Sequence, residues 1–192
     1  MTRNPVLLVH GFFLNSQVFV QLAGHLQARG WSVYAFDLQQ DYRNLGLPDL
    51  AAQVADYIQK TFDRSQRIDL VGFSMGGVIC RYYLQRLGGC DRVRHFVNIS
   101  APNYGTWMAY LLPHLVCVQM RPHSSFLQDL NRDIDKLNLL NVTCLWTDWD
   151  FIIVPASSSQ IPGSKNIKLP VFLHPLMVYH PICLEAIAEA LL

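Results

Sequence analysis

The chain has 192 residues, of which 51% are hydrophobic, and its formal net charge is +1. A chain of this length can bury a sizeable core, and its balanced charge argues against nucleic acid as the main partner. No apolar run reaches the length of a transmembrane helix, and the amino terminus lacks the pattern of a signal peptide. Five cysteines without paired spacing indicate reduced thiols. We therefore expect a cytoplasmic protein.

The first half of the chain alternates predicted strands with predicted helices. Apolar runs without polar alternation predict buried strands at residues 5–9, 31–38, 67–73 and 92–99. Apolar residues three or four positions apart predict helices at residues 17–29, 48–62 and 78–87. Asn15 and Ser16 can cap the first of these helices, and Gly30 can stop it. A polar loop is expected at residues 39–47.

The second half is less regular. Residues 107–140 contain apolar stretches with blurred periodicity, and their later part, 126–140, is amphipathic and predicts a helix. The remaining expected elements are strands at 142–146 and 166–169, a loop at 174–180 and a helix that begins at Pro181. Strands that alternate with helices predict an α/β fold with a mostly parallel sheet. Reactive loops of such sheets gather at the carboxyl ends of the strands.

One motif organises the chain. Residues 72–76 read Gly-Phe-Ser-Met-Gly, between a predicted strand and a predicted helix. Gly-x-Ser-x-Gly in this context is a nucleophile elbow, a tight turn that exposes the serine oxygen above the amino end of a helix. A side chain at Gly72 or Gly76 would collide with the closely packed backbone. Ser74 is therefore the expected nucleophile.

A serine hydroxyl needs a base and a group that orients the base. Asp150 follows a predicted strand, and His180 lies in a loop just before the last helix. Together with Ser74 they give the chain order Ser, Asp, His that the elbow scaffold uses. We take Asp150 and His180 as acid and base, with Asp148 and His174 as the alternatives.

Acyl transfer also requires hydrogen-bond donors that stabilise the developing oxyanion. Each such donor lowers the free energy of the transition state by about 3 kcal/mol. Met75 follows the nucleophile at a helix start, so its backbone N–H is one expected donor. The second should come from the loop after the first strand, where Gly11 lets the backbone turn and Phe12 supplies the N–H; Phe13 is the alternative donor. His10 in the same loop is read as a structural histidine.

Taken together, five motifs of this sequence resemble those of the α/β-hydrolase superfamily, and within it those of the small lipase and esterase (triacylglycerol lipase-like) group. They are Val-His-Gly-Phe at 9–12, Val-Gly-Phe-Ser-Met-Gly-Gly at 71–77, Ala-Pro-x-x-Gly-Thr at 101–106, Asp-x-Ile-Ile-Val-Pro at 150–155, and the late His180. The resemblance implies the α/β-hydrolase fold and ester hydrolysis through an acyl-enzyme, without a cofactor or a metal. Larger members of the family have extra strands before the first one predicted here. Since this sequence has no residues there to form them, we expect a minimal sheet of about six strands.

Two departures from this family concern the substrate. Asn103 and Tyr104 follow Pro102, where lipases often have a histidine, and the segment 107–140 is longer than a plain connector. Its apolar part, 107–118, is either a lid or acyl-chain wall that meets lipid, or a helix packed on the sheet. We assign residues 1–192 to one domain, in which 107–140 would hold any lid.

The sequence thus predicts a serine hydrolase that cleaves carboxylic esters, in particular acyl-lipid esters. Phe13 and Trp107 are the expected substrate contacts. An ester or lipid is the expected partner, with peripheral contact to a membrane or lipid interface. The alternatives are an acyltransferase or thioesterase on the same scaffold, and a binding module that keeps the fold without turnover.

Overall fold

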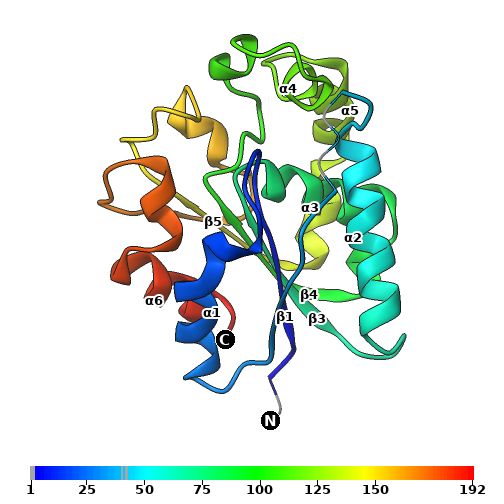
Figure 1. The fold of residues 1–192 in the computed structure, drawn as a ribbon, viewed down its shortest axis with the longest axis vertical. Helices are drawn as coiled ribbons and strands as arrows, with labels where there is room; N and C mark the ends of the chain where they lie inside the picture. The colour runs from blue at the N-terminus through cyan, green and yellow to red at the C-terminus, as the bar shows by residue number, and fades with distance from the viewer. Residues whose placement is uncertain (1–2, 40, 42) are drawn as a thin grey trace.

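The computed structural model describes residues 3–39, 41 and 43–192; Gln40 and Tyr42 of the expected loop lie outside the described residues. Six strands form one sheet in the order β2-β1-β3-β4-β5-β6, with every neighbouring pair parallel (Figure 1). The strands are β1 Val6–Val9, β2 Val33–Ala35, β3 Ile68–Phe73, β4 Val93–Ile99, β5 Asn141–Trp146 and β6 Lys165–Lys168. The prediction of a mostly parallel sheet of six strands is confirmed.

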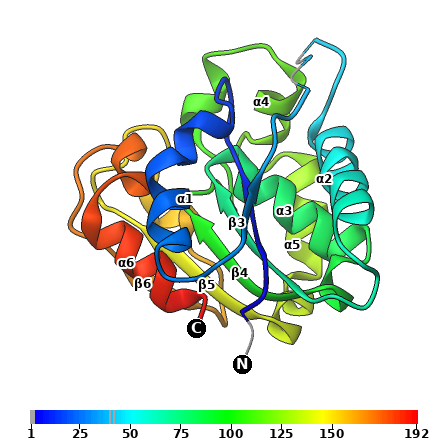
Figure 2. The same cartoon turned by 60° about the horizontal axis from the view of Figure 1, so that its bottom comes forward.

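Helices cover both faces of the sheet. They are α1 Val20–Gln27, α2 Leu47–Thr61, α3 Met75–Arg86, α4 Leu115–Gln119, α5 Ser125–Arg132 and α6 Pro181–Ala190. α1 and α6 lie together on one face, and α2, α3 and α5 lie on the other (Figures 1 and 2). Alternate residues of the same strand enter different cores: Leu7 packs with the α2–α3 side, whereas Val6 and Leu8 pack with the α1–α6 side. This alternation explains why β1 reads as a continuous apolar run.

Two predicted helices are interrupted. The first begins with a 3₁₀ turn, Ser16–Phe19, whose N-cap Asn15 accepts a hydrogen bond from the Gln17 amide at 3.1 Å. The helix predicted at 126–140 divides into α5 and a 3₁₀ segment, Ile134–Leu139. The break falls at Asp133, whose carboxylate forms ion pairs with Arg86 and Lys136. Among the described residues, no helix is long and apolar enough to span a membrane.

The segment 107–140 has two unequal parts. α5 is fastened to α3, because Arg86 forms ion pairs with Asp129 and Asp133 at 2.8 and 2.7 Å. Residues 107–120, comprising a 3₁₀ turn and α4, lie instead above the carboxyl ends of the strands, at the end of the molecule opposite the amino terminus (Figure 1). Only this first part therefore borders the edge of the sheet where the predicted site lies.

Candidate active site

Ser74 occupies a strained turn between β3 and α3. Its φ and ψ are 56° and −127°, a conformation that a non-glycine residue adopts only when its surroundings impose it. The Ser74 amide donates to the Ile99 carbonyl of β4 at 2.8 Å. A Cβ at Gly72 would lie 2.6 Å from the Cα of Gly77, and one at Gly76 would lie 2.1 Å from the Val9 carbonyl oxygen. The predicted elbow geometry, including the need for both glycines, is confirmed.

Asp150 is buried beyond the end of β5 and is held on both carboxylate oxygens. Oδ1 accepts hydrogen bonds from the amides of Ile152 and Ile153 at 3.0 and 2.8 Å, and Oδ2 lies 2.7 Å from Nδ1 of His174. Its alternative, Asp148, is more than half exposed and pairs with Lys168 at 3.1 Å. The structure thus gives Asp150, and not Asp148, a histidine partner.

The prediction that Asp150 pairs with His180 is wrong. His180 is the N-cap of α6, where its exposed side chain accepts a hydrogen bond from the Ile182 amide at 3.3 Å. The physical reason is local: the 3₁₀ turn His174–Val178 separates the two histidines, and only the first stays beside the carboxyl edge of the sheet. A histidine directly before Pro181 is in a helix-capping position, since proline favours the first helical turn, and this signal could have favoured His174.

A ring contact and the conformation of its loop hold His174 in place. Its ring stacks on Phe73, the residue before the nucleophile, with centroids 4.8 Å apart. The Thr147 hydroxyl donates to the Val171 carbonyl at 2.6 Å, which ties the loop that carries His174 to the end of β5. Leu173 has a positive φ of 77°, so the backbone is strained directly before the histidine. Because Nδ1 faces Asp150, Nε2 is the ring nitrogen that could exchange a proton with a nucleophile.

A cavity of about 360 Å³ opens at Ser74 and is almost entirely apolar. Its walls come from four loops and are formed by Phe12, Ser74, Met75, Pro102, Thr106, Met108, Ala109, Leu111, Leu112, Cys117, Met120, Ile152 and Ile153. Phe12 and Met75, the expected oxyanion donors, both border it. Phe13 and Trp107, the expected substrate contacts, do not line this cavity; their side chains are 64% and 55% exposed outside it.

The loop after β1 is held close to the nucleophile by His10. The buried imidazole accepts a hydrogen bond from the Leu38 amide at Nε2 and donates from Nδ1 to the Gly11 carbonyl, both at 3.0 Å. This pattern corresponds to the neutral ring, and burial lowers the pKa of His10. A Cβ at Gly11 would lie 3.0 Å from the Cβ of Ser74, so the two loops approach more closely than a side chain permits.

Thr106 joins the wall of the cavity to the loop of Asp150, a role that the sequence analysis missed. Its hydroxyl donates to the Ile152 carbonyl at 2.7 Å and accepts from the amides of Val154 and Met108 at 2.9 and 3.3 Å. The neighbouring Trp107 amide also donates to the Val154 carbonyl at 2.9 Å. One buried side chain thereby couples residues 107–110 to residues 150–154.

The cavity contains a second potential nucleophile, the thiol of Cys117. Burial raises the pKa of Cys117, and an apolar environment suppresses the thiolate that makes cysteine reactive. The arrangement therefore favours chemistry at Ser74.

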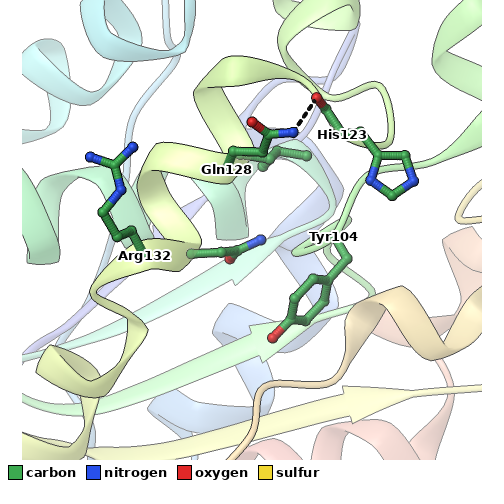
Figure 3. A pocket seen from close by; sticks show the side chains of 6 residues that line it. Tyr104, His123, Gln128 and Arg132 are labelled. Carbon is green, nitrogen blue, oxygen red and sulfur yellow. Dashed lines mark hydrogen bonds between the residues drawn. The ribbon is translucent and has the colours of Figure 1, made fainter.

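A larger hollow, of about 530 Å³, lies away from Ser74 between the loop after β4 and α5. Figure 3 shows Gln128 between Arg132 and His123, with its amide donating to the His123 carbonyl at 3.1 Å, and Tyr104 on the opposite side. Arg81 is buried nearby and donates to the backbone of Asn103 and Leu130 and to the Asn131 side chain. Burial lowers the pKa of Arg81 to about 10, so it keeps its charge at neutral pH. These groups fasten the loop to α5, which is a structural role.

Comparison with known proteins places this geometry in a family. The family described as the alpha/beta hydrolase fold matches residues 4–121, more than half of the chain. The structure is similar to that of a Bacillus licheniformis lipase in its mature form, with a TM-score of 0.82 and 14% identity over 99% of this chain and 92% of that one. It is also similar to Aspergillus fumigatus lipase B, with a TM-score of 0.82 and 19% identity over 98% of this chain and 52% of that one.

A third structure, the thioesterase domain from the curacin biosynthetic pathway, has a TM-score of 0.72 and 14% identity over 98% of this chain and 90% of that one. At sequence identities this low, the structural similarity shows a shared fold and no more, because one fold can host several activities. The match to the family, the elbow and the six-stranded parallel sheet nevertheless agree: this chain belongs to the α/β-hydrolase fold family.

Proposed function

We propose that this protein hydrolyses carboxylic esters with an apolar acyl group, with Ser74 as the nucleophile, His174 as the base and Asp150 as the group that orients the base. The observation that carries the proposal is the buried pair of Asp150 and His174, which stacks against the elbow strand beside the only strained serine that borders the apolar cavity among the described residues. This combination supplies a nucleophile, a base and a site for the acyl chain.

In the proposed reaction, the Ser74 oxygen attacks the ester carbonyl while Nε2 of His174 takes the hydroxyl proton. In this proposal the backbone N–H groups of Phe12 and Met75, two residues that line the cavity, stabilise the oxyanion that forms. The proton then passes to the leaving alcohol, and the acyl group stays on Ser74. Water, deprotonated by His174, releases the acid and restores the enzyme.

The shape of the cavity supports an acyl chain as the bound group. Its volume of about 360 Å³ is at the lower end of the range of small-molecule sites, about 300–1,000 Å³. Cys117, Met120 and Ala109 are buried, whereas Leu111 and Ile152 are exposed, so the cavity has a covered and an open side. We propose residues 107–120 as the acyl-chain wall, which includes the apolar stretch 107–118 expected from sequence and extends it by two residues.

The test is hydrolysis of p-nitrophenyl esters from acetyl to palmitoyl, comparing the wild type with Ser74→Ala and His180→Ala. Loss of turnover in Ser74→Ala with an unchanged melting temperature is the expected result, and His180→Ala should retain activity because His180 only caps α6. Retained hydrolysis in Ser74→Ala would contradict the proposal. Matched oxygen esters and thioesters would separate an esterase from a thioesterase.

A further inference from the structure

A hollow of about 330 Å³ lies at the amino edge of the sheet, opposite to the edge that carries Ser74. It is lined by Arg67, Val93, Arg94, Leu139 and Asn141. Arg67 directly precedes β3, Arg94 is the second residue of β4 and Asn141 is the first residue of β5, so the starts of three neighbouring strands form the hollow. These strands begin at the end of the molecule near the amino terminus, away from residues 107–120 (Figure 1). The hollow is therefore separate from the candidate active site.

A bulge in β4 presents Arg94 to the hollow. The paired register of β3 and β4 shifts near the start of the two strands, and a bulge of this kind redirects the side chains beside it. Arg94 is exposed between two buried neighbours, Val93 and His95. Oδ1 of Asp69 accepts a hydrogen bond from the His95 amide and lies 3.0 Å from Nδ1 of the His95 ring. Buried contacts thus hold the backbone that carries Arg94.

Arg67 brings a second guanidinium to the same place. Its Nη1 donates to the Val93 carbonyl, in the peptide group directly before Arg94, at 3.3 Å. Neither arginine forms an ion pair with a carboxylate of the described residues, and no acidic side chain lines the hollow. Two positive charges therefore share one hollow without an acidic partner from this part of the chain.

The polar groups of the hollow suit a doubly charged oxyanion. A guanidinium offers N–H donors in a planar fork that matches the oxygens of a phosphate, and the amide of Asn141 adds a further donor. A phosphomonoester carries about −1.5 to −2 charges at pH 7, which two guanidinium groups balance. The volume of about 330 Å³ is within the range of small-molecule sites, about 300–1,000 Å³. Leu139 supplies an apolar contact for an organic group attached to the phosphate.

We infer that this hollow binds a small organic phosphomonoester, with Arg67 and Arg94 on the phosphate oxygens and Leu139 against the organic group. The inference goes beyond the proposed function and does not depend on it, because no residue of the hollow lines the Ser74 cavity. Binding involves no covalent step, and it is sensitive to salt because both guanidinium groups are accessible to solvent.

The experiment is isothermal titration calorimetry of the folded protein with phenyl phosphate. We expect binding at one site, which weakens as NaCl is added because exposed charges are screened. Arg94→Gln and Arg67→Gln should each raise the Kd at least tenfold. Arg64→Gln is the matched control, since Arg64 is exposed and belongs to the same loop before β3 but does not line the hollow. Ser74→Ala should bind phenyl phosphate as the wild type does.

Three comparisons define what the hollow recognises. Inorganic phosphate should bind more weakly than phenyl phosphate because it lacks the contact with Leu139, and benzoate should bind more weakly because it carries a single charge. Equal affinity for either would overturn the assignment to a phosphomonoester. Co-sedimentation with vesicles that contain phosphatidic acid, without binding of phenyl phosphate, would indicate a lipid surface instead and would overturn the inference.

The variants supply the remaining outcomes that would contradict the site. No binding of phenyl phosphate by the folded wild type would overturn the inference, and so would an equal loss of affinity in Arg94→Gln and Arg64→Gln. Loss of binding in Ser74→Ala would place the ligand at the opposite edge of the sheet and would likewise overturn it.

Discussion

The sheet holds two buried Asp–His pairs, one at each end. At the amino end, Oδ1 of Asp69 lies 3.0 Å from Nδ1 of His95, and the same oxygen accepts from the His95 amide and from Asn4. At the carboxyl end, Asp150 and His174 approach to 2.7 Å. Burial is similar in the two pairs. The pairs therefore differ in their position in the fold and not in their own chemistry.

Position decides what each pair can do. Asp69 is the second residue of β3, and Ser74 follows the same strand five residues later, about 16 Å away at the rise of a strand. The amino-end pair joins β3 to β4 and has no access to that hydroxyl. The carboxyl-end pair lies on loops beside it. An Asp–His pair thus becomes a candidate catalytic pair only where the topology brings it to a nucleophile.

Replacing each of the two histidines with alanine, one at a time, is the strongest test of this difference. We expect His174→Ala to lower kcat by at least about 10⁴-fold, because the base is lost. His95→Ala should leave kcat largely unchanged but lower the free energy of unfolding by roughly 2 kcal/mol, since it removes a buried hydrogen-bond partner of Asp69. Ester hydrolysis and chemical denaturation measure the two effects. Equal losses of kcat in the two variants would contradict the comparison.

Thr106 tests whether the carboxyl-end pair depends on its loops. Thr106→Val keeps the shape of the side chain but removes the hydroxyl that holds Ile152 and Val154, so the loop of Asp150 loses an anchor. We expect kcat to fall roughly 10- to 100-fold, because small displacements at a reacting centre are costly, with a smaller change in KM. Thr106→Ser should restore kcat. A melting temperature that falls in both variants with no change in kcat would assign Thr106 a purely structural role.

The smallest expected effect concerns pH. The folded-state pKa of His10 lies below its ordinary value of 6.5 because burial disfavours the charged ring, so the unfolded chain binds this proton more readily. The contribution of His10 to stability is therefore complete above pH 6.5 and is lost as the pH falls toward the folded-state pKa, by at most about 1.4 kcal/mol per pH unit. Denaturation between pH 5 and pH 8, with His10→Gln as control, measures it. An unchanged pH dependence in the variant would exclude His10 as the cause.

Local sequence determined most of the fold and two residues of the candidate site, Ser74 and Asp150. The elbow at Ser74 could be predicted because its two glycines are required by contacts with residues near in the motif or on the adjacent strand. The central strands β1, β3 and β4 could be predicted because strands buried on both faces are mostly apolar. Asp150 could be predicted from its position in the loop after a strand.

Only the tertiary structure decided between His174 and His180, because the choice depends on how a 3₁₀ turn directs the chain after β6. Thr106 belongs to the motif at 101–106, but its role escaped prediction for a related reason: its hydroxyl bridges segments about 46 residues apart. The apolar cavity at Ser74 likewise arises only where loops that are far apart in sequence meet at one edge of the sheet. Sequence specifies chemistry within a turn or a strand, whereas side-chain pairs between distant loops exist only once the parallel sheet has aligned the strand ends.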